Sequence, residues 1–177
     1  MSKAAACESL TLAVHPNARG YGWVAFEGPL ALYDWGLVVV RGDKNARSLE
    51  RIEAMLERMR PQTLVLEAFD QHFSLRRPRI ARLCRAIISL GANRGVDIAI
   101  YTRDQVVGAF APVGAKTRHE IAEAVARHME PLRHRLPKRR RAWQCEDRRL
   151  SLFSAAALGL THFQLSVERL LGELGAA

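Results

Sequence analysis

Three short apolar runs follow one another near the start of the chain, and the connections between them are too short to hold a helix. The runs cover residues 10–14, 20–27 and 30–40. The first ends in His15-Pro16, and Gly28-Pro29 marks the second turn. Strands joined by such short connections pair as antiparallel neighbours. The sequence therefore predicts a three-stranded meander, in which His15 stands where the first strand gives way to a turn.

Helical and extended patterns alternate after the meander. Apolar residues recur at helical spacing over residues 46–60 and again over residues 80–90. An apolar run at 63–66 ends in Glu67, and another covers residues 96–101. Strands that alternate with helices pair in parallel through crossover connections. We therefore expect an α/β fold with a mixed five-stranded sheet, covered by helices on both faces.

The rest of the chain is expected to be helical with one interruption. Helices are predicted over residues 103–110, 117–129 and 148–174, and a basic loop over residues 131–146. Residues 1–8 have the composition of a loose leader. Because the sequence shows neither a repeat nor a second core, we predict a single domain over residues 1–177.

Basic residues outnumber acidic ones, and arginine dominates them. Lys and Arg number 27 against 18 Asp and Glu, which gives a net charge of +9 and a pI near 10.3. Arginine suits bidentate phosphate contact, and clustered charge favours nucleic acid as a partner over solubility alone. The three widely spaced cysteines form neither a disulfide framework nor a zinc motif. We expect a reduced, cytoplasmic protein with no signal peptide, membrane span or small-molecule substrate.

The positive charge gathers in two places, at the start of the second predicted helix and in the basic loop. Both are either solvated charged surfaces or the walls of a phosphate-binding groove. Trp143 adds a surface on which a base can stack. Arg85 extends the ridge of the first cluster. The predicted nucleic-acid contacts are Arg76, Arg77, Arg79, Arg82, Lys116, Arg118, Arg133, Arg135, Lys138, Arg139, Arg140, Arg141 and Trp143.

Two polar residues, His15 and Glu67, stand at the ends of apolar strands. Because the carboxyl ends of neighbouring central strands meet at one edge of an open sheet, we expect these side chains to be neighbours. Each also has a structural explanation. Glu67 is then an exposed carboxylate in a salt bridge, and His15 is a turn residue hydrogen-bonded to the backbone.

Asp147, Ser151 and Ser154 are expected on one face of the last helix, since they lie four and three residues apart. A carboxylate at Asp147 suits the N-cap or first turn of that helix. The two serines interrupt an alanine-rich face that should pack on the sheet. Either they bond back to the helix backbone, or they line a polar pocket at the strand ends.

Four segments and their order resemble the RuvC-type Holliday-junction resolvases of the ribonuclease H-like superfamily. They are LAVHPNARGYGWV, LVLEAFD, YTRDQVVGAFAPVGAKTRHEIAEAV and EDRRLSLFSAAALGLTHF, and the resemblance covers residues 10–165. It implies a ribonuclease H-like fold, a homodimer and branched DNA as the partner. It also implies four carboxylates that hold two magnesium ions for phosphodiester cleavage.

Three of the four acidic positions that the resemblance implies carry other residues here. His15 takes the place at the first strand and Glu67 fits the fourth strand, while Ser151 and Ser154 align with the acids of the closing helix. Asp147 is the nearby carboxylate that can substitute, ahead of the two weaker candidates Asp70 and Asp34. Because magnesium prefers several carboxylate oxygens, we expect these residues to bind it poorly. Manganese also accepts an imidazole ligand such as His15.

Three hypotheses follow for the function. The first is a protein that binds branched or structured DNA through a basic groove, with a degenerate or weakly active nuclease site that need not require a cofactor. The second is an active Mg2+- or Mn2+-dependent endonuclease that uses Glu67, Asp147 and His15, with Ser151 and Ser154 in the site. The third is a non-catalytic assembly protein that uses the fold to contact other proteins.

Overall fold

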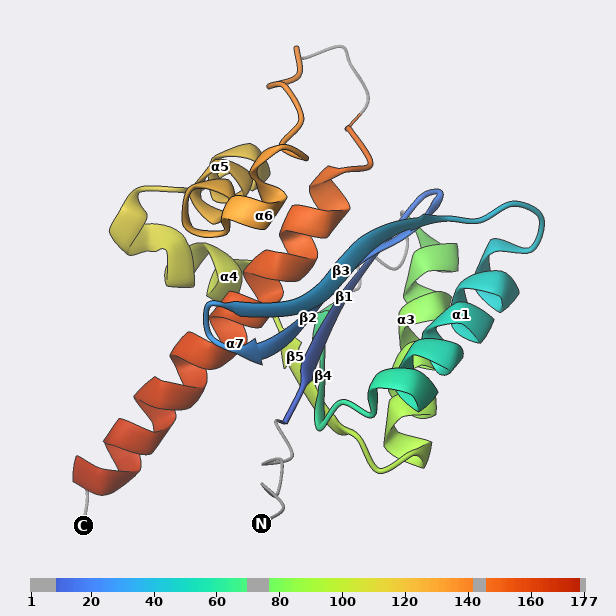
Figure 1. Ribbon diagram of the computed structural model, residues 1–177, viewed down its shortest axis with the longest axis horizontal. Coiled ribbons are helices and arrows are strands. Elements are labelled where there is room, and N and C mark those ends of the chain that lie inside the picture. Colours follow the sequence, from blue (N-terminus) through green and yellow to red (C-terminus); the bar gives the residue numbers. More distant parts are fainter. Residues whose placement is uncertain (1–8, 70–76, 142–145, 176–177) are drawn as a thin grey trace, which may run out of the picture.

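A central mixed sheet of five strands organises the computed structural model (Figure 1), which describes residues 9–69, 77–141 and 146–175, and side chains as far as residue 168. The strands are β1 (Thr11–Asn17), β2 (Gly20–Gly28), β3 (Ala31–Val39), β4 (Thr63–Glu67) and β5 (Asp97–Tyr101). Their order is β3-β2-β1-β4-β5. β1, β2 and β3 are antiparallel to one another in sequence order, whereas β4 is parallel to both β1 and β5. The predicted meander with two added parallel strands is therefore confirmed.

Helices cover both faces of this sheet, as Figure 1 shows. α1 (Lys44–Met59) and α3 (Pro78–Asn93) lie on one face. On the other face lie α4 (Arg103–Phe110), α5 (Arg118–His128), α6 (Glu130–Arg133) and the long α7 (Leu150–Gly175), with a 3-10 turn at Ala111–Val113. The two layers have separate apolar cores because alternate residues of each strand point to opposite faces.

The two central strands show this alternation. Leu12 and Leu64 pack toward α1 and α3, whereas Ala13 and Val65 pack toward α7. The residues that follow in step on the α7 face are His15 and Glu67, so the apolar core of that face gives way to polar groups at the carboxyl ends of β1 and β4.

The first strand is longer than predicted. It continues through His15-Pro16 to Asn17, and His15 pairs with Gly22 of β2 inside the ladder. The expectation that His15 ends the strand is therefore wrong. Pro16 is tolerated because the paired register of β1 with β4 ends at Ala13, so the strand is hydrogen-bonded on one side only at the proline. The turn to β2 shrinks to Ala18 and Arg19.

The last helix is long and apolar enough over Leu150–Glu168 to cross a membrane by length and composition, but more than half of that stretch is buried inside the molecule. Gly22 allows this helix to approach the sheet closely, because a Cβ at Gly22 would collide with the backbone of Ser151 and Leu152. α7 is thus a core helix whose first turn rests directly on β2.

Candidate functional site

His15 and Glu67 form a hydrogen-bonded pair at the carboxyl ends of β1 and β4. The parallel register matches Thr11 with Thr63 and Ala13 with Val65, which brings His15 beside Glu67 two residues further on. His15 Nε2 lies 2.9 Å from Glu67 Oε2. The prediction that these side chains are neighbours is confirmed, and it follows from the parallel pairing of the two strands.

The carboxylate of Glu67 is stabilised in its charged form. His15 is only 8% exposed, and the side chain of Glu67 is 17% exposed. Burial alone raises the pKa of Glu67, but the hydrogen bond and charge of His15, with the charges of Arg118 and Arg103, lower it to about 2. Glu67 is therefore ionised throughout the neutral range.

Two arginines approach Glu67 from the first residues of two helices. Arg118 begins α5, and its Nη2 lies 3.8 Å from Glu67 Oε2 while its Nη1 lies 3.4 Å from Glu146 Oε1. Arg103 begins α4 and is close enough for its charge to lower the pKa of Glu67. Burial lowers the pKa of the Arg103 guanidinium, and the positive charge of Arg118 lowers it further.

Capping boxes fix the positions of both arginines. Thr102 caps α4 with Gln105, and Thr117 caps α5 with Glu120, so each helix begins at a defined residue. Thr102 follows β5 directly, which puts Arg103 at the same sheet edge as Glu67. Arg103 was not among the site residues predicted from sequence; the Thr-Arg-Asp-Gln capping box directly after β5 is the signal that could have identified it.

The two serines lie on the helix side of the site but serve different neighbours. Ser151 Oγ accepts a hydrogen bond from Asn17 Nδ2 at 2.8 Å and donates one to the carbonyl of Arg148 at 2.7 Å. Ser151 thus bonds to its own helix turn and to β1 at once. Ser154 lines a small cavity together with Glu67 and Arg103.

Asp147 is engaged by a local partner rather than by the strand side of the site. It lies three residues before α7 begins, so the expectation that it occupies the N-cap or first turn is wrong. The side chain of Arg149 binds it through Nη2 at 2.7 Å, and the Arg149 backbone N–H donates to Oδ1 at 2.8 Å. This is an Asx turn, and the Arg149 hydrogen bonds hold the pKa of Asp147 below its usual value.

Two clefts meet at His15, Pro16 and Arg118. One, of about 380 Å³, also contains Asn17 and Ser151 together with Arg19, Arg77, Glu146, Asp147 and Arg148. The other, of about 510 Å³, also contains Glu67, Phe69, Thr102, Arg103 and Asp104. His15, Glu67, Asp147 and Ser151 therefore line connected clefts, whereas Ser154 lines the separate small cavity.

Comparisons with solved structures identify the fold. Thermus thermophilus RuvC in complex with a Holliday junction substrate is 19% identical, with a TM-score of 0.66 over 90% of this chain and 96% of that one. A second Thermus thermophilus RuvC structure is 20% identical, with a TM-score of 0.62 over 90% and 97%. The yeast mitochondrial Holliday junction resolvase Ydc2 is 13% identical, with a TM-score of 0.55 over 92% and 81%. The chain has the RuvC-type resolvase fold. No family model matches the sequence, and no curated protein matches it either.

The residues at this RuvC-type sheet edge do not fit a pair of magnesium ions. Within residues 9–69, 77–141 and 146–168, no group of three His, Cys, Asp or Glu side chains is arranged to hold a metal. Magnesium needs several oxygen ligands, usually carboxylates, but here two arginines flank Glu67. A softer metal would need His15, whose Nε2 is bound to Glu67 and whose Nδ1 is enclosed. The roles proposed for His15, Glu67, Asp147, Ser151 and Ser154 in catalysis stay predictions.

The first basic cluster divides into a structural arginine and exposed ones. Arg79 donates to the carbonyl of Asn17 at 3.0 Å and to Asn45 Oδ1 at 2.9 Å, so it ties α3 to β1 and α1. Arg77 and Arg82 are exposed, and Arg77 lines the first cleft. Arg76 lies outside the described residues, as do Trp143 and Asp70.

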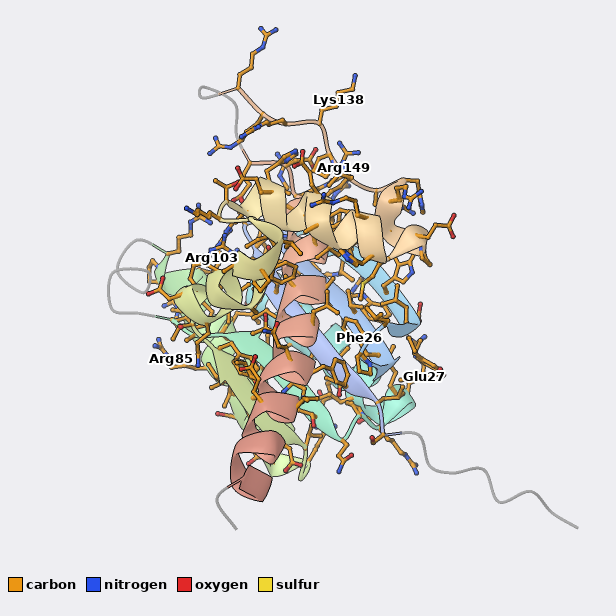
Figure 2. The ribbon with its side chains drawn as sticks, turned by 90° about the vertical axis from the view of Figure 1, so that its left-hand side faces the viewer. Phe26, Glu27, Arg85, Arg103, Lys138 and Arg149 are labelled. Atoms are coloured by element: carbon orange, nitrogen blue, oxygen red, sulfur yellow. The ribbon has the colours of Figure 1, made fainter. Side chains whose placement is uncertain are left out.

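The second cluster extends beyond the first turn of α7. Figure 2 shows Lys138 at the outermost part of that end, near Arg149, and far from Phe26 and Glu27. Arg135 stacks over the Trp35 ring at 5.6 Å, and Arg139 lies 3.9 Å from Glu120. The remaining members, Lys116, Arg133, Lys138, Arg140 and Arg141, are exposed. We call residues 133–141 with Arg19, Arg77, Arg118 and Arg148 the basic end.

Proposed function

We propose that this chain binds branched DNA through the basic end, and that its resolvase-type site does not support efficient cleavage. The proposal that cleavage is inefficient rests on one observation, which is that His15, Arg118 and Arg103 surround and compensate the charge of Glu67. Glu67 keeps its negative charge, but the arginines beside it oppose the approach of a divalent cation. Asp147, the predicted substitute ligand, is bound by Arg149.

The net charge and the fold support the proposal that the chain binds branched DNA. The net charge is +9, and exposed arginines and lysines gather around the clefts at the carboxyl ends of β1 and β4. A structure of similar fold, Thermus thermophilus RuvC, was solved with a Holliday junction substrate. Phosphate contacts from such a surface supply affinity that falls steeply with salt. We also propose a homodimer, in which two copies face one junction.

Gel-shift titrations of a labelled four-way junction in EDTA test the binding. We expect tight binding to the junction, weaker binding to linear duplex of the same length, and a steep linear fall of log K with log salt. Replacing Arg139, Arg140 and Arg141 by Gln should make this slope shallower, by about 0.9 for each phosphate that the protein no longer neutralises. Junction binding that is absent or insensitive to salt would contradict the proposal, and an unchanged triple variant would favour a protein-assembly role.

Cleavage is tested on the same junction with Mg2+ and with Mn2+. We expect no nicking above that of a protein-free control, and we expect Glu67→Gln to bind the junction as the wild type does or better. Metal-dependent nicking that disappears in Glu67→Gln would instead establish the active endonuclease. Light scattering of the free protein and of the junction complex measures the number of copies.

A further inference from the structure

We propose that Arg103 and Arg118 form a metal-independent binding site for one backbone phosphate of the DNA, at the sheet edge where Glu67 ends β4. The inference rests on the proposed function, because it assumes that the basic end binds DNA. It adds a defined site, a defined ligand group and a prediction that divalent ions are not needed for binding.

Arg103 and Arg118 line the same cleft with Glu67, and the pKa of Arg103 is lowered by burial and by the charge of Arg118 although Glu67, Glu146 and Asp104 act in the opposite direction. Arg118 is 3.8 Å from Glu67 and 3.4 Å from Glu146, and both distances exceed the roughly 2.7 to 2.9 Å of a well-formed charge-assisted hydrogen bond. Arg103 is partly buried, and the charge of Arg118 acts against it. Glu67 is shared between both arginines and His15. An additional anion beside the arginines would relieve their mutual repulsion.

The surrounding clefts provide access and further positive charge. Arg118 lines both clefts. The first cleft is also lined by three more arginines and two carboxylates, namely Arg19, Arg77, Arg148, Glu146 and Asp147. Asp147 is already bound by Arg149. Volumes of about 380 and 510 Å³ are large enough for a phosphate and its sugar. Anionic ligands therefore meet a concave, cationic surface here.

His15 belongs to the lining that the two clefts share with Arg118. Its Nδ1 is buried and has no hydrogen-bond partner among the described residues, although buried polar atoms are normally paired. The same ring lines both clefts and donates or accepts at Nε2 with Glu67.

Single neutral methylphosphonate linkages, moved through the strands around the branch point, test the site in EDTA. For the wild type we expect one linkage at which neutralisation weakens binding about tenfold, as the loss of a charged hydrogen bond implies. Arg118→Gln and Arg103→Gln should weaken binding to the unmodified junction by a similar factor. In each single variant the same linkage should cause a smaller loss, and in the double variant it should cause none, because both partners are then gone. Added Mg2+ should leave wild-type binding unchanged once ionic strength is matched.

Arg127→Gln is the matched control, since Arg127 is an exposed arginine of α5 that lines neither cleft. It should change affinity less than about twofold and keep the sensitivity to the linkage. If Arg118→Gln does not fold by circular dichroism, Arg118→Lys replaces it; the lysine keeps the charge but loses the fork, so we expect a partial loss.

The outcomes separate this inference from the proposed function. Junction binding that tolerates both arginine variants and keeps its full sensitivity to every methylphosphonate overturns the inference alone. Binding that requires Mg2+ overturns the inference and also contradicts the junction binding expected in EDTA. A wild type that binds no junction in any buffer overturns the proposed function and the inference together.

Discussion

The strand side and the helix side of the site differ in what their polar groups bond to. On the strand side, His15 and Glu67 come from β1 and β4, and they bond to each other across the sheet. On the helix side, Asp147 bonds to Arg149, and Ser151 donates to the carbonyl of Arg148. The strand side is thus built from long-range pairs, whereas most bonds of the helix side are made within one turn of the chain.

This difference shows which polar groups of the site depend on the pairing of the strands and which depend only on their own turn of the chain. The sheet fixes the spacing between His15 and Glu67, so a carboxylate in that place must have a partner, and His15, Arg103 and Arg118 supply it. On the helix side, the pairing of strands does not fix the positions of the polar groups. Ser151 donates to a carbonyl of the preceding turn, so its hydroxyl proton is satisfied without a partner from the strands.

The largest effect is expected where the two sides touch, at Gly22. A Cβ there would overlap the backbone of Ser151 and Leu152, and backbone cannot move aside as a side chain can. We expect Gly22→Ala to lower the free energy of unfolding by about 3 kcal/mol or more, as measured by urea titration.

Gly108→Ala is the control for this variant, because a Cβ at Gly108 in α4 meets nothing within 4 Å. Alanine in a helix is favoured over glycine, so this change should be neutral or stabilise by up to about 1 kcal/mol. Equal destabilisation in the two variants would show that α7 does not rest on β2 as described.

The sheet was predictable from sequence because short apolar runs bounded by turn residues are a local pattern that tertiary packing preserves. The adjacency of His15 and Glu67 was predictable as well, since parallel pairing aligns strand ends. The length of β1 was not, because Pro16 is a turn signal in sequence and only the missing β4 partner makes it acceptable in the strand.

The partners of charged side chains were the part that sequence did not determine. Arg79 belongs to a basic ridge by spacing, yet it binds Asn17 and Asn45, which lie far from it in sequence. Asp147 accepts a hydrogen bond from the nearby Arg149 side chain rather than from the strand side of the site. A flexible charged group selects among several neighbours, and the fold decides which of them are within reach.

A substitution on the strand side, Glu67→Gln, should cost about 2 kcal/mol at pH 7, because Gln keeps an acceptor for His15 but loses the charge. The pKa of Glu67 falls from an ordinary 4.5 to about 2 in the folded chain. A lowered pKa stabilises the fold above about pH 4.5, and this contribution disappears as the pH falls toward 2. Urea titrations at about pH 7 and pH 3 should therefore show a difference between wild type and variant that shrinks at low pH. A difference that stays constant with pH would contradict the charge-based explanation.

A carboxylate introduced on the strand side, by His15→Asp, gives a further test of the difference between the two sides. Two carboxylates side by side repel each other, so we expect this variant to be less stable than the wild type without metal. Addition of about 10 mM Mg2+ should recover about 1 kcal/mol, as a site of millimolar affinity would give. The wild type and the matched variant His15→Asn should show no such gain in thermal unfolding. A wild type stabilised by Mg2+ as strongly as the variant would mean that the native residues already hold the ion.

The smallest effect is expected on the helix side, at Asp147. Its partners are the backbone and side chain of Arg149, two residues away and partly exposed, so Asp147→Ala should lower the free energy of unfolding by about 1 kcal/mol or less. Asp147→Asn keeps the oxygen that closes the Asx turn and should cost still less. Urea titration measures both at neutral pH. A destabilisation in Asp147→Ala as large as that in Glu67→Gln would place Asp147 in the long-range network of the strand side and erase the difference between the two sides.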